Sequence, residues 1–507
     1  MDDKIIVSNQ TRLKAKYGSD GLARIVTAVD ALIEADGERG IKSRLVFLDR
    51  AGTMHGFKGR AVTDATDRAQ NKHAIDAIFR KANPDYLMIL GAIDVVPHQD
   101  MKNPVFDPPD DPDKSADGDL PYACDTPFSR DIATFKGPTR VVGRLPDLHG
   151  ATGSPSYLLR LLATATKYRS RKPTDYTKYF GLSTHSWRKS TKESLFNMFG
   201  NDDALNLSPP KGPNHSAKTL APLAHFVNCH GGQAAPEFFG ERGNSQPVSL
   251  SSDSIANKIK RGTVAAVECC YGAELYDSVI LSLPMPICQR YLNRGAYGYF
   301  GSSTIAYGPE EGNGAADLIT QFFLLAVLEG ASLGRAALTA RQKFVEQVGE
   351  LDPMDLKTLG QFNLLGDPSI HPVQIVSPTG VPKGVDVDSS KRQERQQRRS
   401  KLRDMGELLQ KTKPTAAQKA GKVRKSPAVR MALANIARKA GIGARKEFTA
   451  YKVKMPKGVR RRGTKAAPVA SRYYVAVYRP AEDAYSVTAV AKEVAGRITG
   501  YRIYVEK

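Results

Sequence analysis

The sequence predicts an α/β fold in which helices cover mainly parallel sheets, followed by a small basic α+β module. Two observations support this prediction. Short, almost wholly apolar runs alternate with amphipathic stretches through residues 1–373, as expected for strands buried on both faces and separated by covering helices. Residues 374–507 hold 32 Lys and Arg but 10 Asp and Glu, a net charge of +22 that equals the net charge of the whole chain. The chain therefore joins two physically different parts.

The first part is predicted to contain seven strands and five helices. The strands follow apolar runs at Arg44–Asp49, Tyr86–Gly91, Arg140–Arg144, Tyr179–Thr184, His225–Cys229, Thr263–Cys269 and Ala296–Ser303. The helices follow amphipathic stretches at Thr66–Lys81, Ser154–Tyr168, Asp253–Lys260, Ala315–Leu328 and Leu333–Val348.

The second part begins with a linker over residues 374–390, because Ser377–Ser390 is rich in Pro, Gly and Ser. Residues 391–507 are predicted to form the basic module. Its helices are expected at Lys391–Gln410 and Ala428–Gly441, and its alternating strands at Glu447–Lys454, Arg472–Arg479 and Arg502–Lys507.

Composition excludes several classes of protein. Hydrophobic residues make up 41% and charged residues 25% of the chain, which excludes a wholly disordered or fibrous protein. No apolar run approaches the ~18 residues that a membrane span needs. The opening MDDKIIVSNQ lacks the apolar core of a secretory signal, and an odd number of cysteines argues against a disulfide framework. These features predict a cytoplasmic protein with no membrane contact.

Two strand–turn segments contain the residues suited to catalysis. His225–Gly232 (HFVNCHGG) and Thr263–Gly272 (TVAAVECCYG) each run from a buried strand into polar residues and then glycine. Adjacent parallel strands end at the same edge of a sheet, so we expect His230 to lie close to Cys269 and Cys270. A thiolate beside an imidazole is the minimum for thiol catalysis.

The glycine after the histidine adds a second element. Without a Cβ, Gly231 lets its backbone N–H approach a substrate carbonyl, and the N–H of the nucleophilic cysteine completes an oxyanion hole. A zinc site made of Cys229, His230, Cys269 and Cys270 is the alternative. It is disfavoured because adjacent residues on a strand point to opposite faces.

A strand followed by His-Gly, and then a strand followed by Cys, is the order found in the caspase-like (clan CD) cysteine peptidases. The chain resembles this group, and more closely its gingipain-type branch. Five further segments resemble motifs of that branch, and with them the resemblance covers roughly residues 85–373. They are YLMILGAIDVVP (Tyr86–Pro97), DLPY (Asp119–Tyr122), RVVGRLP (Arg140–Pro146), RGAYGYFGSSTIAYG (Arg294–Gly308) and NLLGDPSI (Asn363–Ile370).

The resemblance implies a cysteine endopeptidase that cleaves protein substrates and requires no cofactor. It implies two subdomains, an N-terminal α/β subdomain over residues 1–150 and a caspase-like catalytic subdomain over residues 151–373. Many relatives in the clan prefer Arg or Lys before the cleaved bond, whereas caspases prefer Asp. The residue that this chain prefers there is therefore left open.

The resemblance also implies roles for individual residues. His230 corresponds to the catalytic histidine, and Gly231 and Cys270 to the donors of the oxyanion hole. Cys270 is favoured as the nucleophile because Cys269 then supplies the small residue that usually precedes it. Gingipains place glycine three residues after the nucleophile, which would select Cys269 instead. The acidic residue that orients the histidine is not identified, since Thr139 stands where it is sought.

The loop Asp107–Asp119 concentrates carboxylates and prolines. Asp113, Ser115 and Asp117 match the opening of a calcium loop, but its twelfth position is Cys124 rather than the glutamate that such a loop needs. A solvated acidic loop is therefore favoured, with a weak structural calcium site as the alternative.

The basic module suits one of two kinds of partner. Its charge is sufficient for salt-dependent binding of nucleic acid, and Tyr473, Tyr474 and Tyr478 could stack on bases. Docking on a protein regulator or on the peptidase itself is favoured, with control of the peptidase as its purpose. Two other functions remain open: a non-catalytic caspase-like scaffold, and a nucleic-acid-binding protein that acts through residues 391–507.

Overall fold

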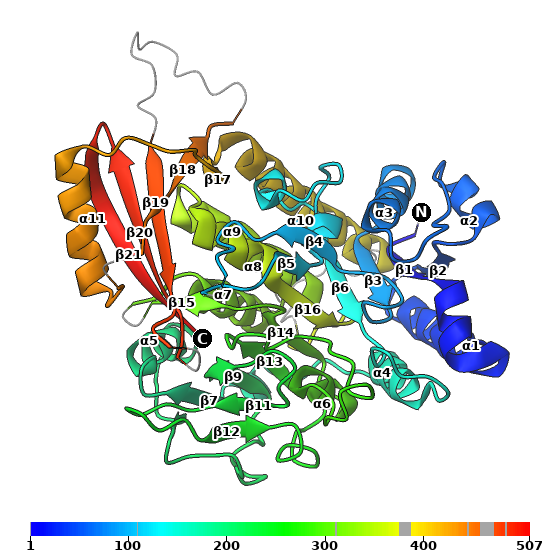
Figure 1. The fold of residues 1–507 in the computed structure, drawn as a ribbon. Helices are drawn as coiled ribbons and strands as arrows, with labels where there is room; N and C mark the ends of the chain where they lie inside the picture. The colour runs from blue at the N-terminus through cyan, green and yellow to red at the C-terminus, as the bar shows by residue number, and fades with distance from the viewer. Residues whose placement is uncertain are drawn as a thin grey trace.

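The computed structural model describes residues 2–108, 110–309, 312–374, 387–443, 446–456, 471–481 and 484–507, with the backbone alone for residues 387–392. Figure 1 shows the first part of the chain in blue to yellow-green, and the strands and the helix α11 of the C-terminal module in orange and red at the opposite end from the N-terminus. Most of the predicted linker, residues 375–386, lies outside the described residues.

One ten-stranded sheet runs through the first part of the chain, in the order β2-β1-β3-β6-β16-β14-β13-β9-β7-β8. Its N-terminal half contains β1 (Lys4–Ser8), β2 (Ser43–Phe47), β3 (Tyr86–Leu90) and β6 (Val142–Leu145). β16 (Phe362–Gly366) runs in the same direction and belongs to this half. The other half contains β7 (Tyr179–Thr184), β8 (Leu205–Ser208), β9 (Ala224–Asn228), β13 (Val264–Val267) and β14 (Gly298–Ser302).

The two halves of this sheet run in opposite directions. β16 pairs parallel with β6 but antiparallel with β14, so the direction changes between β16 and β14. All other neighbouring strands of this sheet are parallel. The ends of β9 and β13 therefore open on a different edge from the ends of β1 and β3. The predicted α/β class with mainly parallel strands is confirmed, and the two predicted subdomains share a continuous sheet.

Helices cover both faces of the sheet, as alternating apolar strands and amphipathic helices require. α7 (Ala316–Leu328) packs on α8 (Leu333–Val348) and β13, while α1 (Gln10–Glu38) packs on α4 (Ser156–Thr166). The remaining helices of this part are α2 (Ala51–Gly56), α3 (Arg68–Ala82), α5 (Arg188–Phe199), α6 (Ile287–Asn293) and α9 (Pro353–Gln361). Short strands outside the main sheet are β4 (Gln99–Lys102), β5 (Ser115–Gly118), β10 (His230–Gly231), β11 (Glu237–Phe239), β12 (Val248–Ser251) and β15 (Tyr307–Gly308). None of the helices in the described parts of the chain is long and apolar enough to cross a membrane.

One predicted helix is wrong. Asp253–Lys260 forms successive turns instead of a helix. Just before and within it, the hydroxyls of Ser251 and Ser254 accept hydrogen bonds from each other's backbone N–H groups at 3.1 and 3.0 Å. Serine side chains that bond to nearby backbone groups compete with helix formation, which explains the difference.

The C-terminal module is built on an antiparallel sheet. Its strands β17 (Thr415–Lys419), β18 (Thr449–Lys454), β19 (Arg472–Tyr478), β20 (Val487–Val494) and β21 (Arg497–Glu506) pair in sequence order, and β15 of the first part extends the sheet beside β21. α11 (Pro427–Lys439) covers one face through Val429, Leu433 and Ile436. Tyr473 and Tyr474 are buried in this sheet and present no exposed stacking surface, whereas Tyr478 is half-buried, so the stacking interpretation is wrong for the first two.

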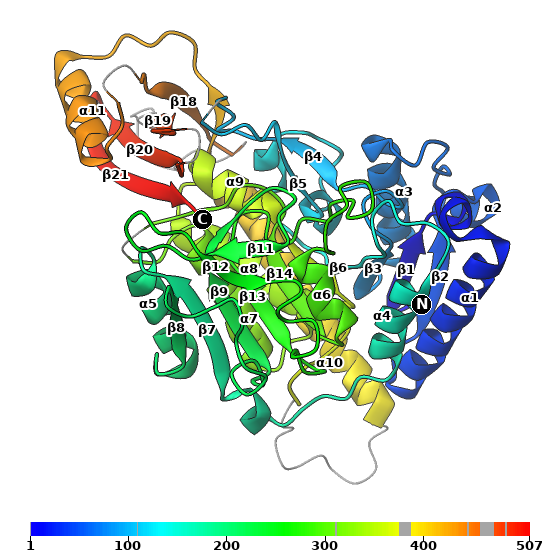
Figure 2. The ribbon, with the colours of Figure 1, turned by 60° about the horizontal axis from the view of Figure 1, so that its bottom comes forward.

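The module is joined to the first part along its length. Tyr451, Tyr473 and Tyr504 belong to the same hydrophobic core as the main sheet. α10 (Val387–Thr412) begins within the residues predicted as a linker and packs on α8. Both views show α10 lying against the first part rather than projecting from it (Figures 1 and 2).

Candidate active site

Two neighbouring strands bring the predicted catalytic residues together. β9 and β13 are parallel, with Val227 opposite Val267, so they reach the same edge of the sheet in register. His230 follows β9 by two residues, and Cys270 follows β13 by three. The expected juxtaposition of the two segments is present.

Gly231 shows how closely the two segments approach. A Cβ on this residue would lie 2.0 Å from the carbonyl oxygen of Cys270 and 3.3 Å from the Cβ of Cys269. Real Cβ atoms do not come that close to backbone, so a side chain here would push the segments apart. Glycine is required by contact, not by backbone conformation.

The two candidate nucleophiles differ in their surroundings, although all five cysteines are free and buried. The Sγ of Cys270 lies 3.2 Å from the backbone nitrogen of Ala306 and 3.3 Å from its oxygen. Burial raises the pKa of the Cys270 thiol well above its ordinary value, and the charge of Glu506 adds to this. Burial likewise raises the pKa of Cys269, with the neighbouring thiol of Cys229 as the next cause.

His230 is buried between aromatic rings and oriented by a carboxylate. Its ring stacks on Tyr485 at 3.3 Å between centroids and meets Trp187 edge-on at 4.4 Å. Its Nε2 lies 3.1 Å from Oε2 of Glu241, and its Nδ1 is buried with no hydrogen-bond partner among the described residues. Burial lowers the pKa of His230, and the hydrogen bond and charge of Glu241 counter this only in part. The imidazole is therefore neutral near pH 7.

Glu241 is the acidic residue that contacts His230, and the sequence did not reveal it. Desolvation works against its charge, yet hydrogen bonds from His230 and Ser186 hold the pKa of Glu241 below its usual value. It lies in the connection after β11, where one acidic residue among several gives no positional signal. Thr139, near which the acid was sought, lies in the other half of the sheet and has no described partner for its buried hydroxyl.

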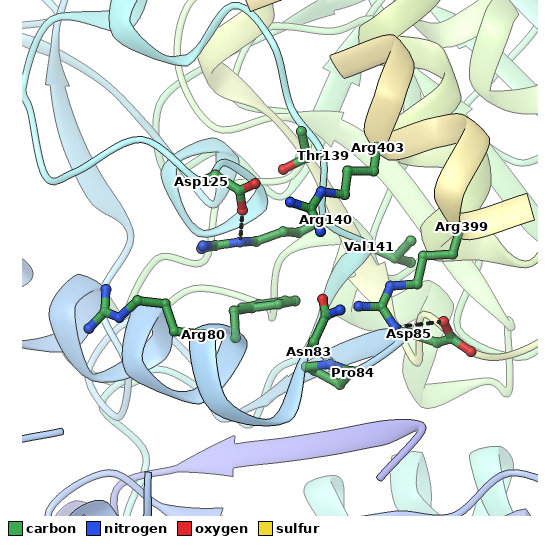
Figure 3. Close-up of a pocket in the computed structure, with 11 residues that line it drawn as sticks. Arg80, Asn83, Pro84, Asp85, Asp125, Thr139, Arg140, Val141, Arg399 and Arg403 are labelled. Carbon is green, nitrogen blue, oxygen red and sulfur yellow. Dashed lines mark hydrogen bonds and ion pairs between the residues drawn. The ribbon is translucent and has the colours of Figure 1, made fainter. Parts of the chain in front are cut away.

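Thr139 instead lines a cavity of about 300 Å³ between α3, the start of β6 and α10 (Figure 3). Four arginines contribute to its lining: Arg80, Arg140, Arg399 and Arg403. Two carboxylates pair with them, Asp125 with Arg140 at 2.7 Å and Asp85 with Arg399 at 3.4 Å. None of its lining residues was predicted to be catalytic, and it does not reach Cys270.

The two predicted oxyanion-hole donors meet at one oxygen atom. The backbone N–H groups of Cys270 and Gly231 both donate to the carbonyl oxygen of Lys507, at 2.9 and 3.4 Å. The occupant is thus the C-terminal residue of the basic module, 237 positions beyond Cys270. Both views place the C-terminus at this edge of the main sheet (Figures 1 and 2).

A buried acidic pocket adjoins these donors and holds the Lys507 side chain. Its Nζ lies 2.5 Å from Glu268, 2.8 Å from Asp317 and 2.9 Å from Oδ1 of Asn228. The ring of Trp187 lies 4.9 Å from the same nitrogen. Glu268 was not predicted to take part in such a pocket. Asp317, Asn228 and Trp187 were also missed, because they come from separate elements.

The charges in this pocket depend on one another. Burial and the charge of Asp317 raise the pKa of Glu268 well above its ordinary value, while Lys507 opposes this. Burial works to lower the pKa of Lys507, but the charges of Asp317 and Glu268 outweigh it and raise that pKa. The pocket therefore favours a cation, since two buried carboxylates without one repel each other.

The calcium candidates take part in other contacts. Asp113 accepts hydrogen bonds from the hydroxyl of Tyr271 at 2.7 Å and the backbone of Ile305 at 2.8 Å, and lies 3.2 Å from the ammonium of Lys357. Ser115 and Asp117 lie on β5, paired antiparallel with β4. Across the residues that the structure describes, no group of three or more His, Cys, Asp or Glu side chains could hold a metal ion.

The acidic loop also contacts the basic module. Lys446 lies 2.8 Å from Asp107 and pairs with Asp110, whose carboxylate also accepts a hydrogen bond from the backbone of Arg479 at 2.7 Å. The loop is thus a docking surface, and the favoured interpretation as a solvated loop is wrong.

Comparison with known proteins finds similar structures at low sequence identity. No family model matches the chain, and no curated protein matches it in sequence. A solved structure described as a protease is similar over 99% of this chain and 97% of its own, with a TM-score of 0.49 and 13% identity. The Saccharomyces cerevisiae separase–securin complex is similar over 46% of this chain and 14% of the matched one, with a TM-score of 0.27 and 14% identity.

Proposed function

We propose that this chain is a cysteine endopeptidase with a Cys270–His230 dyad. The observation that supports it best is the convergence of the Cys270 and Gly231 N–H groups on one carbonyl oxygen. Two backbone N–H groups aimed at one backbone oxygen are the arrangement that stabilises the charge of an acyl-transfer intermediate. A buried histidine held by a carboxylate completes the groups needed for thiol chemistry.

Each group has a defined task in this proposal. The Cys270 sulfur attacks the substrate carbonyl carbon, and the oxygen takes up negative charge between the N–H groups of Gly231 and Cys270. The proton of the thiol passes to Nδ1 of His230, the ring nitrogen that Glu241 leaves open, and then to the leaving amine as the carbon–nitrogen bond breaks. Water next hydrolyses the thioester, which releases the acid product and restores the thiol.

Peptide hydrolysis tests this function directly. Fluorogenic peptides with Lys, Arg, Asp or Ala before the reporter group are incubated with the protein and its Cys270→Ala and Cys269→Ala variants. We expect cleavage that Cys270→Ala abolishes and Cys269→Ala retains. Loss of cleavage in Cys269→Ala alone would move the nucleophile to Cys269. Equal cleavage by the protein and both variants would contradict a peptidase at this site.

The basic module is proposed to control this peptidase. Its contacts with the acidic loop and with the catalytic edge support docking on the peptidase itself over docking on nucleic acid. The scaffold and nucleic-acid hypotheses have no observation of comparable weight in the described residues.

A further inference from the structure

Residues at the end of β21 lie across the candidate site as an added strand. β21 pairs antiparallel with β15, with Glu506 opposite Tyr307 and Val505 opposite Gly308, and the N–H of Lys507 donates to the carbonyl of Ala306 at 2.9 Å. An extended peptide that adds a strand to a sheet edge is a common mode of peptide recognition. The backbone of residues 505–507 therefore lies as that of a bound peptide would.

The carbonyl group of Lys507 occupies the place of a group to be attacked. Its oxygen receives both N–H groups of the candidate oxyanion hole, and the Sγ of Cys270 lies beside Ala306, the residue that receives the Lys507 N–H. The N–H of Lys507 is bonded to Ala306, and its oxygen is bonded to the N–H groups of Cys270 and Gly231. These contacts together determine the position of the Lys507 carbonyl carbon. Lys507 thus stands where the substrate residue before the cleaved bond would stand.

The side chain of Lys507 matches its pocket in charge and in number of hydrogen bonds. An ammonium group has three N–H donors, and three acceptors surround it within 2.9 Å: Glu268, Asp317 and Asn228. All three are fully buried. A planar guanidinium presents five donors in a fixed fork and does not fit three acceptors gathered around one nitrogen, so this chemistry selects lysine over arginine.

The segment is held by the module rather than hanging from it. β21 pairs with β20 along its length, from Val494 opposite Arg497 to Val487 opposite Val505. The carboxylate of Glu506 points back to the module, 2.8 Å from the guanidinium of Arg479. A segment fixed in its bound shape loses little conformational freedom on binding and is present at a high effective concentration.

The same module also covers the histidine. Tyr485 precedes β20 and stacks directly on the His230 ring. The module therefore reaches the oxyanion donors, the cation pocket and the imidazole at once, and a substrate cannot use any of them while it is docked.

We propose that residues 504–507 are an internal competitive inhibitor that lies in the substrate cleft, and that the pocket around Lys507 makes lysine the preferred residue before the cleaved bond. This inference rests on the peptidase function proposed above. It specifies how the basic module would control the site and which substrates the site would take.

Kinetics of matched variants test the proposal. Peptides with the sequence of residues 504–506 followed by Lys, Arg, Asp or Ala and a fluorogenic group are hydrolysed by the full chain and by Lys507→Ala. Arg497→Ala, an exposed basic residue at the far end of the same strand, is the control. We expect kcat/KM for the Lys peptide to rise roughly tenfold or more in Lys507→Ala and to stay unchanged in the control. The Lys peptide should be cleaved faster than the Arg, Asp and Ala peptides.

The outcomes separate this inference from the proposed function. Equal kcat/KM values for the full chain and Lys507→Ala, with Cys270-dependent cleavage in both, would overturn the inhibitor and leave the peptidase standing. Faster cleavage of the Arg peptide would overturn the lysine preference. Cleavage by neither protein with any peptide would overturn the peptidase itself.

A measurement on the unaltered chain applies if Lys507→Ala does not fold. A peptide aldehyde ending in lysine is added in excess, and hydrogen exchange is followed in residues 502–507. We expect exchange there to increase as the aldehyde displaces the segment. An aldehyde bound at Cys270 with unchanged exchange in these residues would overturn the proposal.

Discussion

Lys4 and Lys507 have nearly identical surroundings in different parts of the molecule. Lys4 is fully buried, 2.9 Å from Asp36 and 2.5 Å from Asp367, with Ser369 as a neutral acceptor at 3.1 Å. Lys507 is fully buried between Glu268 and Asp317, with Asn228 as its neutral acceptor. The chemistry of the two clusters is therefore the same: one ammonium, two carboxylates and one neutral oxygen.

The strands that carry them make the difference. Lys4 lies in β1, which is paired on both sides with β2 and β3, so its ammonium cannot leave without opening the main sheet. Lys507 follows the last residue of β21, pairs through its N–H with Ala306 and lies beside Cys270. A buried ion cluster is thus structural where the strand is enclosed, and resembles a bound ligand where the strand ends at the candidate active site.

The largest expected effect is the loss of kcat on removal of the Cys270 thiol, which lies beside the Lys507 cluster and not beside the Lys4 cluster. In the Lys507→Ala background, Cys270→Ala should lower kcat on the order of 10⁶-fold, the loss typical of removing a catalytic nucleophile. Cys269→Ala in the same background should keep most of the activity. Steady-state and single-turnover rates check this. Activity retained by Cys270→Ala would leave the two lysine clusters without a functional difference.

A loss of activity of about 10²-fold or more is expected for Glu241→Gln, since the carboxylate orients His230 and supports its charged form. The acidic limb of the pH profile gives a sharper readout. Glu241 raises the pKa of His230 against the effect of burial, so its removal lowers that pKa further. The acidic limb in Glu241→Gln should therefore move to lower pH. An unmoved limb with reduced kcat would indicate a merely structural role.

Stability distinguishes the two lysines directly. Lys4→Met leaves two buried carboxylates without a cation inside the sheet, and should lower the free energy of unfolding by about 3–5 kcal/mol. Lys507→Met should cost less, because the end of β21 can detach and water can reach Glu268 and Asp317. Urea unfolding of both variants measures this. A larger loss for Lys507→Met than for Lys4→Met would show that both clusters are structural.

The sequence predicted those features of the fold and of the site that depend on neighbouring residues, and missed those that depend on distant ones. The juxtaposition of His230, Gly231 and Cys270 was predicted because each ends a strand pattern, and parallel strands share an edge. Charge partition divided the chain into two parts, and this division stays a prediction. Glu241 and Asp317 could not be predicted, since one lies in the connection after β11 and the other in the first turn of the apolar helix α7, and neither position follows from a local pattern.

The acidic loop shows the same limit in another way. The sequence predicted a solvated acidic loop, and a basic module that docks on a protein or on the peptidase itself, but it did not connect the two. Their pairing, Asp107 and Asp110 with Lys446, became visible only when the fold placed them side by side. Long-range charge complementarity leaves no local trace in a single sequence.

The smallest effect is expected at this loop. Lys446 and Asp107 are partly exposed, so their pair is screened by salt and weaker than the buried clusters. Lys446→Ala should change the free energy of unfolding by at most about 1 kcal/mol, less at high salt than at low salt. Thermal unfolding at two salt concentrations checks this. A loss as large as that of Lys4→Met would place the main anchor of the module at the loop.

In the proposed mechanism of control, Lys507 occupies the place of a substrate beside Cys270. The most direct measurement is the rate at which a lysyl acyloxymethyl ketone alkylates Cys270, followed by mass spectrometry in the full chain, Lys507→Met and Lys4→Met. We predict faster alkylation of Cys270 in Lys507→Met alone. Alkylation of Cys270 at the same rate in the full chain and in Lys507→Met, with both proteins folded, would contradict the account.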